Sequence, residues 1–211
     1  MPNWCATKIE FKGNSDDIKK LHDFISDREA NDAVGIPNDF GLAWLGNYLE
    51  RAGVDHDDYD CRGDVWHVDD LRDEDTSFFI DVDTAWVPML KMWQVIIGKL
   101  NLTDVHITYF AVEPGSELYQ TNDKALVGKY IVDMYDPDAL DAEIVETLSW
   151  DDYESVSEHD LREALCKVLK LTPSQKSMGT AGLIRILNNL TGEDGVSILK
   201  WEEVPIEEAS A

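Results

Sequence analysis

Residues 78–113 read FFIDVDTAWVPMLKMWQVIIGKLNLTDVHITYFAVE. The first seven residues alternate as a half-buried strand does, with Ile80 and Val82 on one face. Apolar residues then recur at helical spacing over 88–100, and alternation returns over 104–113. This stretch therefore predicts a strand, a helix and a second strand.

The chain before this stretch supplies further elements of a sheet domain. Alternation over 4–12 predicts a strand, and an amphipathic helix with Ser15 as its N-cap is expected over 15–27. A second helical stripe covers 42–52, and a short strand is expected over 65–68. These patterns predict both helices and strands before residue 78.

The order of these elements predicts an α+β protein. Apart from the second helix, it is β-α-β-β-α-β, as in ferredoxin-like domains, which have a four-stranded antiparallel sheet with two helices on one face. We expect this domain to span residues 1–135. It carries a helical and acidic insertion at 28–76, and an extra strand is expected over 128–135.

Residues 136–211 are expected to form a mainly helical C-terminal extension. Capping and apolar signals predict helices over 157–171 and 172–192, with Leu190 on the apolar face of the second helix. A closing strand is predicted over 196–201. The last ten residues are acidic and small, and we expect them to fray.

Charge excludes several classes of partner. The chain holds 43 acidic and 18 basic residues, a formal net charge of −25. Residues 51–85 carry a net −9 and residues 131–160 a net −11, the latter without a single Lys or Arg. Such a chain repels nucleic-acid phosphate and anionic lipid. We expect no direct nucleic-acid partner and no membrane association, and a basic protein is the favoured class of partner.

Cysteine usage and motif content narrow the class further. The N-terminal residues lack the basic and apolar runs of a signal peptide, and Cys5, Cys61 and Cys166 form no disulfide framework. We therefore expect a cytoplasmic protein, with Cys61 as its most exposed thiol. No phosphate-binding, dinucleotide-binding or nucleophile-elbow motif is present, so no cofactor is expected. The oligomeric state stays open.

Four short motifs carry a family resemblance. They are MPNWC at 1–5, WLGNYLERAG at 44–53, DTAWVP at 83–88 and EPGSELYQTND at 113–123. In this order they resemble the YubB-like proteins of bacteria, which are often carried on plasmids, phages and conjugative elements. The resemblance covers roughly residues 1–135. It implies a ferredoxin-like N-terminal part, brings no catalytic residues, and makes an anti-defence role an expectation by analogy.

One candidate ligand site lies on the uncovered face of the predicted sheet. Asp81 and Asp83 share a strand face, and His106 lies on the same face of the last strand. Two carboxylates and an imidazole can bind a metal or transfer protons, so a metal-dependent enzyme is the alternative function. Trp86 is either a stacking platform beside this site or a loop anchor, and Glu113 opens the closing turn. Ordinary polar surface is the competing interpretation.

The loop at residues 55–70 is a weaker metal candidate. His56, Asp58 and His67 offer nitrogen and oxygen ligands at close spacing. That spacing matches neither an EF-hand, which needs a fixed Gly and a terminal Glu, nor the paired His of a helical zinc site. We therefore expect a solvated acidic loop and no metal site.

A third candidate is an acidic face for a protein partner. Its residues are Asp136, Asp138, Asp141 and Glu143. Closely spaced carboxylates can imitate the phosphates of a duplex and occupy the basic cleft of a nucleic-acid enzyme. Binding without catalysis is therefore the leading function. A catalytic site would need its acids to converge in a pocket, whereas a mimic needs them exposed on the surface.

Overall fold

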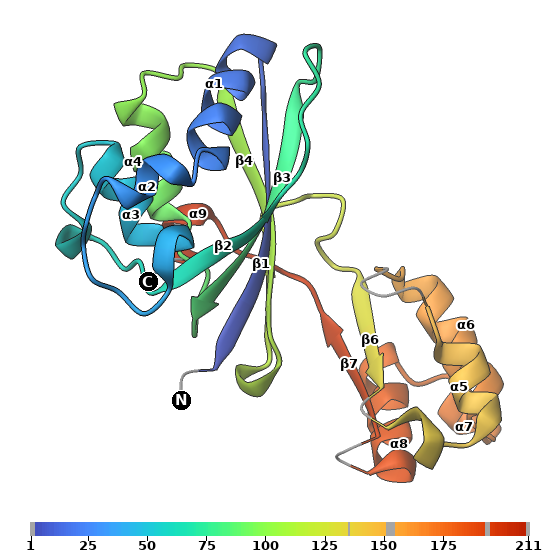
Figure 1. Ribbon diagram of the computed structural model, residues 1–211. Coiled ribbons are helices and arrows are strands. Elements are labelled where there is room, and N and C mark those ends of the chain that lie inside the picture. The colour runs from blue at the N-terminus through green and yellow to red at the C-terminus, as the bar shows by residue number, and fades with distance from the viewer. Residues whose placement is uncertain (1–2, 135, 151–154, 193–194, 210–211) are drawn as a thin grey trace. The chain divides into compact units, whose positions relative to one another are not determined.

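The computed structural model describes residues 3–134, 136–150, 155–192 and 195–209 (Figure 1). The chain divides into two compact units. Unit 1 comprises Met1–Lys124 and Glu203–Ala211, and unit 2 comprises Ala125–Glu202. Across the described residues, every helix is too short or too polar to cross a membrane.

A β-sheet forms the frame of unit 1. The described strands are β1 (Trp4–Gly13), β2 (Gly63–Val68), β3 (Ser77–Ala85), β4 (Val105–Glu113), β5 (Leu118–Thr121) and β8 (Glu202–Glu203), in the order β2-β3-β1-β4-β5-β8. Strand β1 pairs antiparallel with both β3 and β4, and β2 pairs antiparallel with β3. The sequence therefore placed the strands of the deciding stretch correctly and assigned an α+β class that the structure confirms.

Helices cover one side of this sheet. They are α1 (Ser15–Ser26), α2 (Glu29–Asp32), α3 (Leu45–Arg51) and α4 (Lys91–Lys99), and Figure 1 shows α1 and α4 on the same side. The alternation of β1 explains why, since Ile9 and Phe11 are buried while Trp4 and Lys12 are exposed. Each large apolar side chain buried in this way contributes about 1.5–3 kcal/mol.

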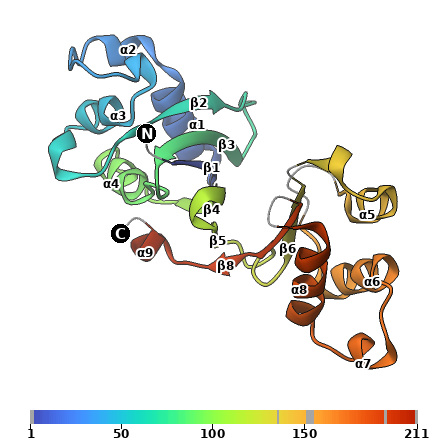
Figure 2. The ribbon, with the colours of Figure 1, turned by 90° about the horizontal axis from the view of Figure 1, so that it is seen from below.

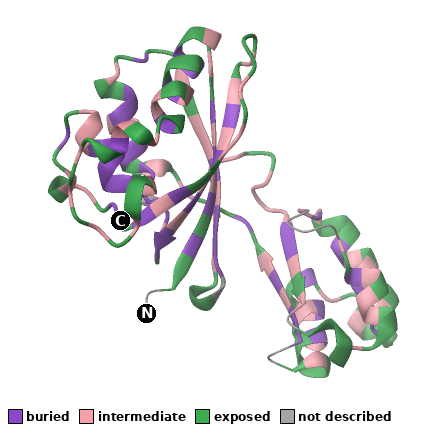
Figure 3. Cartoon of the chain, in the orientation of Figure 1, coloured by how far each residue is buried: buried purple, intermediate pink, exposed green. Residues whose placement is uncertain are grey.

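Aromatic rings fill the core of unit 1. Phe11 packs against Phe78 and Trp93, with ring centroids 5.3 Å and 5.7 Å apart, and Tyr48 lies 5.8 Å from Trp93. Trp93 and Tyr48 are fully buried. These contacts join α3 and α4 to the sheet, as the buried residues in Figure 3 show.

Several predicted boundaries in unit 1 need correction. The N-cap of α1 is Asn14 rather than Ser15, because the Asn14 side chain accepts the Asp17 N–H at 2.9 Å. Helix α4 begins at Lys91 and not at residue 88. The preceding residues Met89 and Leu90 lie in a loop, with their side chains buried in the core. The thiol of Cys61 is buried rather than exposed, since it packs into the same core.

Unit 2 has its own small sheet and core. Strands β6 (Tyr130–Met134) and β7 (Val196–Lys200) pair antiparallel, and the helices are α5 (Ala142–Leu148), α6 (Glu158–Val168), α7 (Pro173–Lys176) and α8 (Thr180–Thr191). Figures 1 and 2 show α6 and α8 side by side. Leu161, Leu165, Leu183 and Leu187 are fully buried.

The expected domain boundary at residue 135 differs from this division. The predicted strand over 128–135 exists as β6, but its partner is β7, so it belongs to unit 2. The single helix expected over 172–192 is two helices, α7 and α8, with Leu190 67% exposed. A capping box at Thr172 sets the short α7, and the chain turns before α8 begins.

Residues 202–209 pack on unit 1 and are not frayed as expected, while residues 210–211 lie outside the described part of the chain. After β8, helix α9 (Ile206–Ala209) follows, as Figure 2 shows. The Val204 N–H donates to the Thr121 carbonyl at 3.0 Å, and the Tyr109 hydroxyl donates to the Val204 carbonyl at 2.9 Å. Ala209 is buried in the core of unit 1. Apolar residues inside an acidic tail were the signal that sequence reasoning missed.

Candidate functional site

A hollow lies on unit 1, between two loops that precede β2. It has a volume of about 520 Å³ and is lined by residues 36–40, Trp44, His56–Asp57 and 59–62. We call it the aromatic groove, because Phe40, Trp44 and Tyr59 contribute to its wall. Sequence reasoning treated these loops as a solvated insertion and did not predict the groove.

Trp44 is the most buried ring of the groove. It precedes α3, forms a backbone bridge with Asp64 of β2, and is only 8% exposed. Its ring lies against Gly46, where an added Cβ would come within 2.4 Å of the indole. The glycine therefore lets the ring lie flat on the first turn of α3.

His56 is held in the groove wall by Glu50. The Glu50 Oε1 atom accepts from the His56 ring Nδ1 at 2.7 Å and from the His56 backbone N–H at 3.0 Å. The side-chain hydrogen bond raises the pKa of His56 and lowers the pKa of Glu50. The His56 ring also packs edge-on to Trp44 at 5.1 Å. This pair fixes the loop to the end of α3.

Glu50, Asp55 and His56 also form a candidate metal cluster. Their ligand atoms lie within 4.8 Å of one another. A metal would need a deprotonated Nδ1, yet this nitrogen lies at hydrogen-bond distance from Glu50, which suits a proton between them. The geometry therefore fits a structural hydrogen bond better than a metal ligand set. Glu50 was not singled out from sequence, because its pairing crosses from a helix to a loop.

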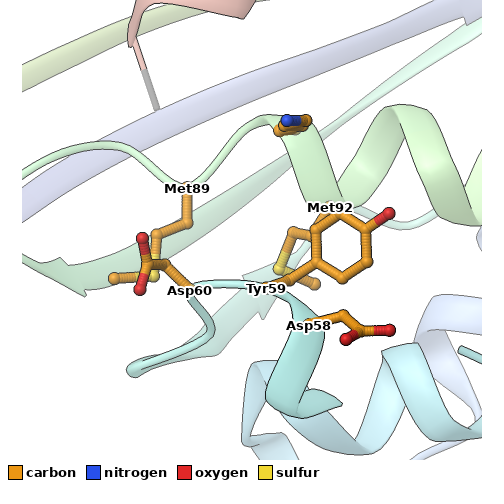
Figure 4. Close-up of a pocket in the computed structure, with 6 residues that line it drawn as sticks. Asp58, Tyr59, Asp60, Met89 and Met92 are labelled. Atoms are coloured by element: carbon orange, nitrogen blue, oxygen red, sulfur yellow. The ribbon is translucent and has the colours of Figure 1, made fainter. Parts of the chain in front are cut away.

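The three metal candidates of the 55–70 loop lie in three different places. His56 lines the aromatic groove, whereas Asp58 lines a smaller hollow of about 130 Å³ with Tyr59, Asp60, Met89, Lys91 and Met92 (Figure 4). His67 lies on β2 with its Nε2 atom 3.1 Å from Asp69. The structure does not bring these three side chains together.

The sheet face places Asp81 and Asp83 beside a third acid. Asp83 pairs directly with Asp64 of β2, and Asp81 pairs with Lys8, whose Nζ atom lies 4.0 Å from its carboxylate. Burial raises the pKa of Asp83, and the charges of Asp64 and Asp81 raise it further. The sequence groups Asp64 with the acidic run at 55–70 instead of with this face, because the register between β2 and β3 cannot be read from a local pattern.

His106 lies away from these acids. It pairs with Lys12, four positions along β1 from Lys8, which corresponds to about 13 Å along the strand. Its side chain is 80% exposed and its Nε2 atom lies 3.6 Å from Asp104. The structure therefore does not bring His106 together with Asp81 and Asp83.

Trp86 and Glu113 have separate roles. Trp86 is 51% exposed, adopts φ 67°, and donates its backbone N–H to the Asn3 carbonyl. The guanidinium of Arg62, which lines the aromatic groove, lies 5.6 Å from the Trp86 ring. Glu113 is 2% exposed and accepts the Gly115 N–H at 2.9 Å, which holds the turn after β4.

The predicted acidic face in unit 2 is fully at the surface. Asp136, Asp138, Asp141 and Glu143 are all exposed, before and within the first turn of α5. The Asp141 carboxylate caps α5 by accepting the Glu143 N–H at 2.9 Å. For the part of the chain that the structure describes, no ion pair involves any of these four residues.

Comparisons with protein-family models, with curated proteins and with solved structures find no match for this chain. Its chemistry is therefore argued from its own geometry. That geometry offers two surfaces suited to a cationic partner, the aromatic groove of unit 1 and the exposed carboxylates of unit 2.

Proposed function

We propose that this protein acts by binding a basic protein, without catalysis, through the acidic face at Asp136, Asp138, Asp141 and Glu143. The observation that carries this proposal is the exposure of all four carboxylates in a stretch, residues 131–160, that contains no Lys or Arg. Unpaired surface charge of one sign accelerates encounter with a partner of the opposite sign.

The positions of the alternative catalytic residues favour binding over catalysis. A metal-dependent enzyme would need Asp81, Asp83 and His106 to converge in a pocket. His106 instead lies about 13 Å along the sheet from the position of Asp81. The acids of the sheet face are partly engaged already, since Lys8 lies beside Asp81.

The proposal extends to the family and its setting. We also propose that unit 1 is a ferredoxin-like domain of the YubB-like kind. The strand order β2-β3-β1-β4, the antiparallel pairing of each neighbour and the four sequence motifs support this proposal. Three free cysteines suit a reducing cytoplasm. Carriage on mobile elements would make a basic nucleic-acid enzyme the partner, with the acidic face imitating phosphates.

The test is capture of partners from a bacterial lysate at several salt concentrations. The variant carries Asp136→Lys, Asp138→Lys and Glu143→Lys, with Asp141→Asn to keep the α5 cap. We expect a basic partner that is lost in this variant and weakens steeply with salt. The matched control reverses four exposed acids of unit 1, Asp32, Asp70, Asp73 and Glu74, and should retain the partner.

A gel shift with duplex and single-stranded DNA at 0.15 M salt completes the test. We expect no shift, because non-specific binding depends on Lys and Arg displacing counterions from phosphate. Retained DNA binding would contradict the electrostatic basis of the proposal. A partner that survives both high salt and the reversals would contradict the acidic face alone.

A further inference from the structure

We propose that the aromatic groove of unit 1 binds an arginine side chain presented by a partner segment. This inference goes beyond the proposed function, because it uses none of the residues of the acidic face and concerns the other unit. The groove holds about 520 Å³, within the range of pockets that bury small ligands or single side chains.

The first argument is the concentration of aromatic surface. Phe40 and Tyr59 are half-buried in the wall, and Trp44 lies beneath them with 8% of its surface exposed. Trp4 packs edge-on against Phe40 at 6.0 Å and is itself 43% exposed, so it extends the groove outward. Large exposed rings at the rim of a hollow mark binding surfaces more often than scattered single rings do.

The second argument is charge. Asp39, Asp57 and Asp60 line the groove with exposed side chains, against one basic residue, Arg62. In the described parts of the chain, neither Asp39 nor Asp60 forms an ion pair. The lining also holds His56, whose pKa is raised by its hydrogen bond with Glu50. Even with this ring protonated, three carboxylates against one guanidinium and one imidazolium leave an excess of negative charge. Its complement is a cation.

The third argument selects arginine among cations. A guanidinium is planar, so it stacks on an aromatic ring while its edge donates two hydrogen bonds to a carboxylate. Unit 1 already uses this stacking twice. Arg62 lies over Trp86 at 5.6 Å, and Arg51 lies over Phe24 at 4.4 Å. The groove offers the same two partners, rings and carboxylates, side by side.

The fourth argument is preorganisation. The Glu50–His56 hydrogen bonds fix one loop of the groove, and the contact of Trp44 with Gly46 fixes the ring. Asn38 fixes the other loop, because its side chain accepts the Phe40 N–H at 2.8 Å. A site built in advance loses less conformational entropy on binding.

The experiment titrates the full-length protein with the peptide acetyl-Gly-Gly-Arg-Gly-Gly-amide at 0.15 M salt. Nitrogen-15 spectra report the seven indole N–H groups, with the three of interest assigned by Trp4→Phe, Trp44→Phe and Trp86→Phe variants. We expect saturable shifts at Trp4, Trp44 and Trp86. The matched citrulline peptide keeps the shape and loses the charge, and should bind about tenfold more weakly.

The variant Asp57→Asn with Asp60→Asn should weaken binding of the arginine peptide by about fivefold or more. The matched control, Asp136→Asn with Asp138→Asn, removes the same charge from unit 2 and should change binding less than about twofold. Asp60→Asn alone provides a milder variant if the double change disturbs the His56 loop, and dispersed indole signals confirm its fold.

Equal binding of the citrulline peptide, or equal weakening by the two double variants, would overturn the inference, since either result means unspecific attraction. Shifts confined to indoles other than Trp4, Trp44 and Trp86 would also overturn it. Neither result bears on the acidic face, because the lysate capture with its own reversals tests that face separately.

Discussion

The acids singled out in the two units differ in whether they form hydrogen bonds within the protein. In unit 1, the Asp17 side chain accepts the backbone N–H groups of Thr103 and Asp104, and Glu50 accepts that of His56. These acids connect loops to helices. The hydrogen bond from the Asn14 side chain, followed by those from the Asp104 and Thr103 backbones, lowers the pKa of Asp17. In unit 2, Glu158 likewise accepts from Thr180, but the four acids of the acidic face are exposed, and among these four described residues Asp141 is the one that caps a helix. Composition alone therefore cannot separate structural acids from acids that are free to meet a partner.

The two cores differ as well. Unit 1 buries a network of Trp, Tyr and Phe rings between helices and a sheet, whereas unit 2 packs mainly leucines from α6 and α8 against β6 and β7. Because the two clusters are separate, damage to one should leave the other folded. The predictions that follow test this difference.

The largest effect is expected from Trp93→Ala. Trp93 is fully buried and contacts both Phe11 and Tyr48, so its loss should destabilise unit 1 by about 3–5 kcal/mol. Hydrogen exchange in low urea should show lost protection in β1 and β4 but not in α6 and α8. Leu190→Ala, at a 67% exposed position, is the control and should change little. Equal loss of protection in both units would show that the two cores do not unfold independently.

Gly46→Ala tests the wall of the aromatic groove. The new Cβ would meet the Trp44 ring at 2.4 Å, so we expect a loss of about 1–3 kcal/mol in urea unfolding. Gly98→Ala in α4 is the matched control, because no atom lies within 4 Å of its Cβ. That change should stabilise the protein by about 0.5–1 kcal/mol. If both variants change the free energy of unfolding in the same direction, helix propensity and not contact with the Trp44 ring determines the effect of Gly46→Ala.

Glu50→Gln should destabilise unit 1 by about 1 kcal/mol in a pH-dependent way. The raised pKa of His56 gives stability that is complete below 6.5 and is lost as pH rises through its folded pKa. The lowered pKa of Glu50 gives stability that is present above 4.5 and is lost in acid. The gap in melting temperature between wild type and variant should therefore be widest near pH 5.5 and narrower near pH 8.5. A gap independent of pH would refute the charged pair.

The smallest effect is expected from salt. The Debye length falls from about 30 Å at 0.01 M to about 8 Å at 0.15 M, so added salt screens repulsion among the net −25 charges. We expect stability to rise over this range, and hydrogen exchange should show the rise more in α5 and α6 than in α1. A fall with salt, or an equal rise in both units, would mean that the acids of unit 2 are paired after all.

Local patterns predicted much of unit 1. Alternation located β1, β3 and β4, because one face of each strand packs on helices while the other meets water. Helical spacing located α1 and α4, within a few residues of their ends. In unit 2 the same reasoning found α6, with Ser157 as its cap, and the strand β7.

The rest depends on contacts between distant residues. The groove arises because residues 36–40 and 56–62 meet, and the pairing of Asp64 with Asp83 depends on strand register. No local pattern encodes either. The role of Glu50 and the pairing of Asp64 with Asp83 were not predicted for this reason. The contacts of Val204 and Ala209 with unit 1 were not predicted either, because the acidic residues around them pointed to a frayed tail.

The ion pair between Lys124 and Glu203 joins the two points at which the chain leaves and re-enters unit 1. Unit 2 is therefore an inserted domain, whose two ends connect to neighbouring residues of unit 1. A short linker from Lys124 to Glu203 should replace it without straining β5 or β8. During synthesis on the ribosome, unit 1 remains incomplete until all of unit 2 has emerged. Strand β8 then adds to the edge of the sheet beside β5, and Ala209 packs into the core.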